Sequence, residues 1–169
     1  MLGLKRGTVK LVPYHKGWSR AFEVERKKLK KKLGKAVIDI QHIGSTAMPG
    51  MHAKPIIDMT AGVKSLSAAK KFVKPLAGLG YHFYKTFGGH VLFAKGPDAK
   101  RTHYLHVMKY NGVKWKRDLL FRDYLRKHPS RAKVYSRTKQ ELAKRFPNDR
   151  GRYTAGKDSF IKDTLRRAA

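Results

Sequence analysis

The chain has 169 residues, of which 41% are hydrophobic and 11% aromatic, so a sizeable core can form and disorder from lack of burial is excluded. It contains no cysteine, which excludes disulfide bonds and thiolate chemistry and fits a reducing compartment. Forty basic residues against 11 acidic ones give a formal net charge of +29, which any account of function must accommodate.

The N-terminal residues lack the apolar stretch of a signal peptide. No segment approaches the roughly 20 consecutive apolar residues of a membrane helix. We therefore expect a cytoplasmic protein with no membrane span, and a chain of this length predicts a single domain.

The first two thirds of the chain alternate between patterns typical of strands and of helices. Residues 8–14 are predicted to form a short strand. A helix should follow to about residue 33, because Trp18, Phe22 and Leu29 fall on one stripe. The remaining patterns predict strands at about 36–43 and 55–63, a helix at 67–79, a hairpin of 81–84 with 90–94 around Gly88-Gly89, and a strand at about 102–109.

From Val113 onward the apolar period becomes helical. Helices are predicted at about 113–127, 131–146 and 153–168, separated by Pro129 and Pro147. This order predicts an α+β fold for residues 1–169, in which a mixed β-sheet flanked by helices over about 1–110 carries three packed helices over about 113–169.

Residues 42–58 hold the densest chemical information. A β-branched run predicts a strand that ends at Gly44 and Ser45, small residues that let a ligand approach the backbone. The Ser45 hydroxyl and N–H could donate to a phosphate oxygen. Pro55 can open the next strand, on which Asp58 would point toward Ser45. A carboxylate there could hold Mg²⁺, which takes oxygen ligands and shares them with substrate phosphates.

Several motifs together resemble the GrpB-like family, whose members look like nucleotidyltransferase-superfamily domains. The resemblance rests on His42-Ile-Gly-Ser-Thr-Ala-Met-Pro-Gly50, Lys54-Pro-Ile-Ile-Asp58, Arg101-Thr-His103-Tyr-Leu-His106-Val107, Phe121-Arg-Asp-Tyr-Leu-Arg126, Tyr135 with Lys139, and Tyr153 with Lys157 and Phe160. It covers nearly the whole chain and implies a nucleotidyltransferase-like mixed β-sheet.

The superfamily would imply a Gly-Ser motif that grips a nucleoside triphosphate while two or three acids bind metal ions. Asp58 is then the implied catalytic and Mg²⁺-binding residue. The position of the second acid holds Thr60, and the strand at 102–106 offers no third acid. Two-metal catalysis needs ions roughly 3.5–4 Å apart on shared carboxylates, so binding is the leading claim and nucleotidyl transfer a secondary one.

The resemblance also implies a set of residues that bind the phosphate or nucleotide. Its members are Gly44, Ser45, Thr46, His42, Lys54, His103, His106, Arg122, Lys139, Tyr153 and Lys157, with Arg126 beside them. Each has a structural alternative, such as a turn serine or a polar network between helices. His103 and His106 should fall on opposite faces of a strand, so zinc is not expected, and one of them should lie beside Asp58.

Basic residues occur in every segment instead of gathering in one groove. A natural role in nucleic-acid binding is one hypothesis, because neutralised phosphates release counterions. The other is that surface acids were replaced wholesale by Lys and Arg, by design or by unusual selection. Lys27 and Lys31 lie four apart on the predicted helix, where like charges cost roughly a few tenths of a kcal/mol. Either origin predicts unspecific attraction to nucleic acid and other polyanions.

The leading interpretation is therefore a domain that binds a nucleotide or related phosphate compound through Ser45, with Mg²⁺ on Asp58. A non-catalytic, highly cationic module that associates with polyanions is the alternative from another class. A scaffold whose ancestral site no longer works is a third.

Overall fold

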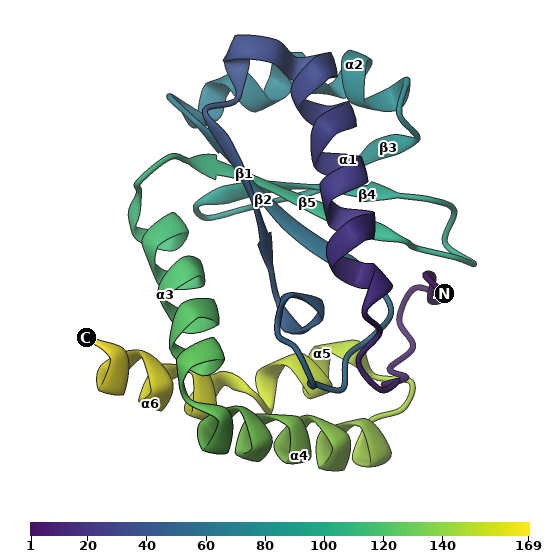
Figure 1. The fold of residues 1–169 in the computed structure, drawn as a ribbon. Helices are drawn as coiled ribbons and strands as arrows, with labels where there is room; N and C mark the ends of the chain where they lie inside the picture. The colour runs from purple at the N-terminus through teal and green to yellow at the C-terminus, as the bar shows by residue number, and fades with distance from the viewer.

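The computed structural model describes residues 1–169, which are organised around a five-stranded sheet (Figure 1). The strands lie in the order β1 (Asp39–Ile43), β2 (Ile57–Val63), β5 (His103–Lys109), β4 (His90–Lys95) and β3 (Tyr81–Phe87). β2 and β5 are parallel, and the other neighbouring pairs are antiparallel. The mixed sheet of the predicted α+β fold is confirmed.

Helix α1 (Gly17–Leu33) crosses one face of the sheet (Figure 1). Its apolar residues recur at helical spacing, so Trp18 and Leu29 lie on one stripe and join β2 and β5 residues in a core of 18 buried side chains. The helix ends at Gly34, whose φ of 56° suits glycine. The 3₁₀ segment η3 (Leu66–Phe72) and the short α2 (Val73–Ala77) contribute to the same core.

The C-terminal residues form four helices, namely α3 (Val113–Lys127), α4 (Pro129–Arg145), α5 (Arg150–Ala155) and α6 (Asp158–Ala168). In Figure 1, α3 descends beside the sheet while α4, α5 and α6 lie below it. Two small clusters join these helices to earlier parts of the chain: Met48 and Met51 with Leu125 and Tyr135, and Val9 with Leu142 and Tyr153. None of the helices combines the length and apolarity needed to cross a bilayer.

The structure corrects three predicted elements. The helix predicted at 67–79 is a 3₁₀ segment over Leu66–Phe72 followed by the short α2 over Val73–Ala77. Residues 8–14 form no strand, because their pairing is limited to one isolated bridge from Val12 to Ala53 in an irregular loop. The helix predicted at 153–168 is interrupted between α5 and α6 at Gly156. A Cβ on that glycine would lie 2.5 Å from a methyl carbon of Leu142, so glycine lets the turn approach α4 closely.

Candidate functional site

A small cavity lies where the loop after β1, the start of β2, and helices α4 to α6 meet. Its volume is about 110 Å³. Most of its lining comes from the residue set implied by the family resemblance: Gly44, Ser45, Thr46, Lys54, Asp58, Lys139, Tyr153 and Lys157. Ala53, Ile56 and Tyr135 complete the lining. We call it the lysine cavity, and the Gly-Ser turn and Asp58 both face it.

Gly44 shapes the wall of the lysine cavity beside Asp58. In the β1–β2 pair Ile43 lies opposite Asp58, so the chain leaves β1 next to the carboxylate. Gly44 has φ 72° and ψ −174°, and a Cβ on it would lie 3.1 Å from Asp58 Oδ2. Glycine adopts this backbone without strain and keeps the carboxylate in place.

Two arginines of α3 fix the Gly-Ser turn through hydrogen bonds to the backbone on either side of it. Arg122 donates hydrogen bonds to the His42 carbonyl at 2.9 Å and to Gln41 Oε1 at 2.8 Å. Arg126 donates from two nitrogens to the Ala47 carbonyl, at 2.7 and 2.9 Å. Neither side chain lines the lysine cavity. The ligand contact implied for Arg122 is therefore corrected: both arginines position the loop that carries Ser45.

His42 is buried away from the lysine cavity. Its ring stacks on Phe22 with the centroids 4.8 Å apart, and its Nε2 lies 2.9 Å from Thr46 Oγ1. Burial lowers the pKa of His42 to about 4, so the ring is neutral at pH 7. The implied ligand contact of His42 is corrected to a structural role, in which the ring orients Thr46.

The two histidines of β5 lie on opposite faces of the sheet. His103 is 7% exposed on the α1 face, where its ring packs 6.5 Å from that of Tyr81, and burial lowers its pKa to about 4. The phosphate contact implied for His103 is corrected, because the sheet separates it from the lysine cavity. His106 lies on the other face, with Nε2 3.4 Å from Asp58 Oδ1 and a buried Nδ1 that has no hydrogen-bond partner.

Three lysines converge on the lysine cavity from three segments. Lys139 of α4 is 1% exposed, and its Nζ donates to Ser45 Oγ at 2.5 Å and to the His52 carbonyl at 2.6 Å. The Nζ atoms of Lys157 and Lys54 lie 4.7 and 5.3 Å from the centre of the Tyr153 ring. An aromatic face and neutral oxygens thus surround most of the positive charge.

Burial lowers the pKa values of all three lysines, and the charges of neighbouring cations add to the shifts. For Lys54 burial is the main cause and the charges of Lys157 and Arg150 add to it, which brings its pKa to about 7. Burial also lowers the pKa of Lys139 well below its ordinary value, and it lowers that of Lys157 although Asp58 opposes the shift. An anion in this cavity would relieve the repulsion.

Asp58 is ionised in this setting. Burial alone would raise its pKa, but the hydrogen bond to His106 and the charges of His106, Lys54 and Lys157 lower it. The side chain retains 33% of its exposed area. The cavity therefore combines one carboxylate with three lysines.

The residues around Asp58 do not fit the expected Mg²⁺. Thr60, at the position of the second acid, is buried and donates to the His106 carbonyl at 3.2 Å. No cluster of three or more His, Asp or Glu side chains that could hold a metal forms anywhere in the chain. A divalent cation on Asp58 would also be repelled by the three lysines of the cavity.

Sequence reasoning missed two residues beside the lysine cavity. Arg150 donates to Tyr104 Oη and to the Thr8 carbonyl, both at 2.8 Å, and its charge lowers the pKa of Lys54. Tyr104 could have been found, because it shares a strand face with His106. Arg150 carries no distinguishing signal among 40 basic residues.

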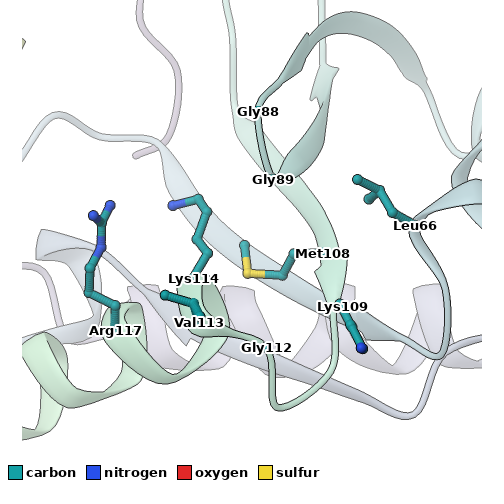
Figure 2. Close-up of a pocket in the computed structure, with 9 residues that line it drawn as sticks. All are labelled: Leu66, Gly88, Gly89, Met108, Lys109, Gly112, Val113, Lys114 and Arg117. Atoms are coloured by element: carbon teal, nitrogen blue, oxygen red, sulfur yellow. The ribbon is translucent and has the colours of Figure 1, made fainter.

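A second, larger cavity lies between the β3–β4 turn, the end of β5 and the start of α3 (Figure 2). Its volume is about 460 Å³. The lining residues are Leu66, Gly88, Gly89, Met108, Lys109, Gly112, Val113, Lys114 and Arg117. We call it the hairpin cavity. Figure 2 shows Lys114 and Arg117 extending from α3 to one side while Lys109 points the other way.

Almost every acidic side chain of the protein takes part in an ion pair. Every Asp and Glu except Asp158 pairs with a basic side chain, counting the contact of Asp58 with His106. Most lysines and arginines therefore have no acidic partner.

The mixed sheet and the lysine cavity define an α+β domain in which a Gly-Ser turn faces an aspartate. A family model described as GrpB protein matches residues 8–167, so the chain belongs to the GrpB family. The "Glutamate-rich protein GrpB" of Alkalihalophilus pseudofirmus is 40% identical over 171 residues, which cover 98% of each chain. The crystal structure of conserved protein GrpB from Enterococcus faecalis matches with a TM-score of 0.86 at 34% identity, covering 94% of this chain and 96% of that one.

A partial match extends to a longer protein. The chain is 29% identical over 191 residues to a dephospho-CoA kinase of Mycolicibacterium paratuberculosis, covering 98% of this chain and 47% of that protein. The name of the Alkalihalophilus relative describes that protein as glutamate-rich. This chain contains three glutamates, Glu23, Glu25 and Glu141.

Proposed function

We propose that this GrpB-family domain binds a nucleotide or related phosphate compound in the lysine cavity. The observation that supports the proposal is the convergence of Lys54, Lys139 and Lys157 beside Ser45 in one small space. Buried like charges destabilise a fold unless a partner offsets them. Lys139 holds the Ser45 hydroxyl oxygen, so the hydroxyl hydrogen is available to an anion in the cavity.

Binding, not turnover, is the activity that these side chains support. The nucleotidyl transfer implied by the wider resemblance would draw on a cluster of carboxylates. Asp58 stands alone among lysines, with Thr60 in place of a second acid. We therefore assign no catalytic step to Asp58.

The choice of ligands to test follows from the family resemblance and from the mycobacterial match. The family resemblance implies nucleotides. The match to a dephospho-CoA kinase adds coenzyme A and its dephosphorylated form to the compounds to be tested. A cytoplasmic location, which stays a prediction, would supply all of them. Thermal melting of the purified chain with each compound tests the proposal.

The test compares Lys157→Met with Lys109→Met, a matched loss of one charge in the hairpin cavity. A ligand at about 100 times its Kd should stabilise the wild type by about 2.7 kcal/mol, or roughly 5–10 °C in Tm. We expect Lys109→Met to keep this shift and Lys157→Met to lose most of it. Equal shifts in both variants, together with shifts from any polyanion, would contradict the proposal.

A second candidate function is association with nucleic acid or other polyanions through the basic surface, whether that surface is natural or engineered. The observation that favours it is that most of the 40 Lys and Arg side chains have no acidic partner, although almost every acid is paired. The affinity for duplex DNA should fall linearly with salt on logarithmic axes. An affinity that is constant between low and high salt would rule out a charge-driven mechanism.

A further inference from the structure

We infer that the lysine cavity takes one terminal phosphoryl group directly on its lysines, without a bridging metal ion. This inference rests on the proposed function and specifies its ligand as a phosphomonoester or terminal phosphate. The surrounding ester or nucleoside would lie outside the cavity.

The size of the lysine cavity sets the first limit. Cavities that enclose a drug-sized ligand measure about 300–1,000 Å³, whereas this one has a volume of about 110 Å³. A water molecule occupies about 30 Å³ in the liquid, so the space matches a few waters or one tetrahedral anion. A complete nucleotide does not fit within it.

The charge of the lysine cavity selects the ligand. An anion bound among Lys54, Lys139 and Lys157 opposes the lowering of their pKa values, so all three are protonated in the complex. Their three positive charges then exceed the single negative charge of Asp58 by two. The dianion of a phosphomonoester carries that difference. A magnesium ion would instead add two positive charges to a space where the ammonium groups already repel one another.

The geometry around the carboxylate supports the same conclusion. Asp58 Oδ1 faces His106 Nε2 at 3.4 Å, and Oδ2 lies against Gly44. Both oxygens are therefore covered by protein on one side. Lys54 and Lys157, in contrast, contact the Tyr153 ring face, and their donors can turn to an anion.

The hydroxyl of Ser45 completes the donor set. Its oxygen accepts the hydrogen bond from Lys139 Nζ, which leaves its own hydrogen to donate into the cavity. Lys139 can donate a third hydrogen bond after those to Ser45 and His52. The arrangement is that of a phosphoryl cradle made from side-chain donors.

The experiment measures binding of inorganic phosphate, AMP and 3′,5′-cyclic AMP by titration calorimetry, in EDTA and again in excess Mg²⁺. Cyclic AMP is a diester and lacks a terminal phosphoryl group. For phosphate, and likewise for AMP, we expect the Kd in EDTA and the Kd in excess Mg²⁺ to differ by less than about twofold. Cyclic AMP should bind at least about tenfold more weakly.

Asp58→Asn separates metal-free binding from binding through Mg²⁺ most sharply. Glu141→Gln is its matched control, because it makes the same change of charge on an exposed side chain. Removing the carboxylate removes a repulsive charge, so we expect phosphate affinity in EDTA to be maintained or increased. If Asp58 instead carried the metal, the same variant would lose binding. The comparison of EDTA with Mg²⁺ on the wild type decides the question even if the variant does not fold.

The outcomes distinguish this inference from the proposed function. Binding that appears only with Mg²⁺, or equal binding of cyclic AMP, would overturn the inference and leave the proposed function standing. Absence of binding by every phosphate compound under both conditions would overturn both. Metal-independent binding that Lys157→Met weakens at least about tenfold, and Lys109→Met does not, would support both.

Discussion

The lysine cavity and the hairpin cavity each contain three basic side chains, yet they differ in what those charges can do. The hairpin cavity is the larger, at about 460 Å³ against 110 Å³. Lys109 and Arg117 are exposed there, and Lys114 pairs with Asp118 at 2.9 Å. Water and one ion pair therefore satisfy the charges without a ligand.

In the lysine cavity, the same kind of charge is buried and convergent. Lys139 is almost fully removed from solvent, and burial lowers the pKa of Lys54 to about 7. Volume alone would have chosen the hairpin cavity as the site. The comparison teaches that the cost of burying charge marks a candidate binding site more clearly than size does.

Replacement of one glycine in each cavity gives the largest expected contrast. Gly44→Ala places a residue with a side chain at φ 72° and pushes a methyl group to 3.1 Å from Asp58 Oδ2. We expect a loss of about 1–3 kcal/mol in the free energy of unfolding, measured by urea denaturation. Gly88→Ala meets no atom within 4 Å and should change stability by less than about 0.5 kcal/mol. Equal effects would show that the two turns are equally constrained.

Replacement of one arginine beside each cavity gives a smaller expected contrast. Arg126→Ala removes two hydrogen bonds to the Ala47 carbonyl, so we expect a loss of about 1 kcal/mol and a weaker phosphate affinity. Arg117→Ala, in the hairpin cavity, should change the free energy of unfolding by less than about 0.5 kcal/mol. Denaturation and phosphate titration check both variants. A neutral Arg126→Ala would mean that the loop carrying Ser45 holds its shape without α3.

The third contrast, which grows only above neutral pH, is a pH dependence of stability due to Lys54. Its pKa is about 7 in the folded chain and 10.5 in the ordinary, solvated state, so between these values the unfolded chain binds more protons. Stability from this group should therefore rise as the pH increases from 7 to 10. Lys157, Arg150 and Asp58 face the Lys54 ammonium group, and Lys157 is expected to contribute in the same direction.

Urea denaturation at several pH values measures this trend. Lys54→Met should flatten the rise and should be at least as stable as the wild type at pH 7, because it removes a buried charge. Lys109→Met should keep the full slope. A wild-type stability that falls from pH 7 to 10, or an unchanged slope in Lys54→Met, would show that Lys54 is solvated in the free protein.

Much of the fold could be predicted because its signals are local. Three kinds of signal each act within a few residues. They are the stripe of Trp18, Phe22 and Leu29, the glycines between β3 and β4, and the prolines at the start of α4 and before α5. Apolar periodicity alone did not predict the interruption at Gly156, although a glycine inside a helical pattern is a local signal against a continuous helix. The close approach of this turn to Leu142 of α4 is a tertiary contact. Periodicity does not report such contacts.

In the candidate site, too, local signals predicted some features and tertiary packing decided the others. The sequence by itself predicted that Ser45 and Asp58 would face one cavity, and both line it, because strand alternation sets side-chain direction and the loop joins neighbouring strands. The family resemblance had already named Lys54, Lys139 and Lys157 among 40 basic residues. Only the tertiary structure decided that they are buried together, since they come from separate segments. It also places His42, His103 and Arg122 outside the lining of the lysine cavity. Burial depends on packing by residues far away in the chain, and no local pattern contains it.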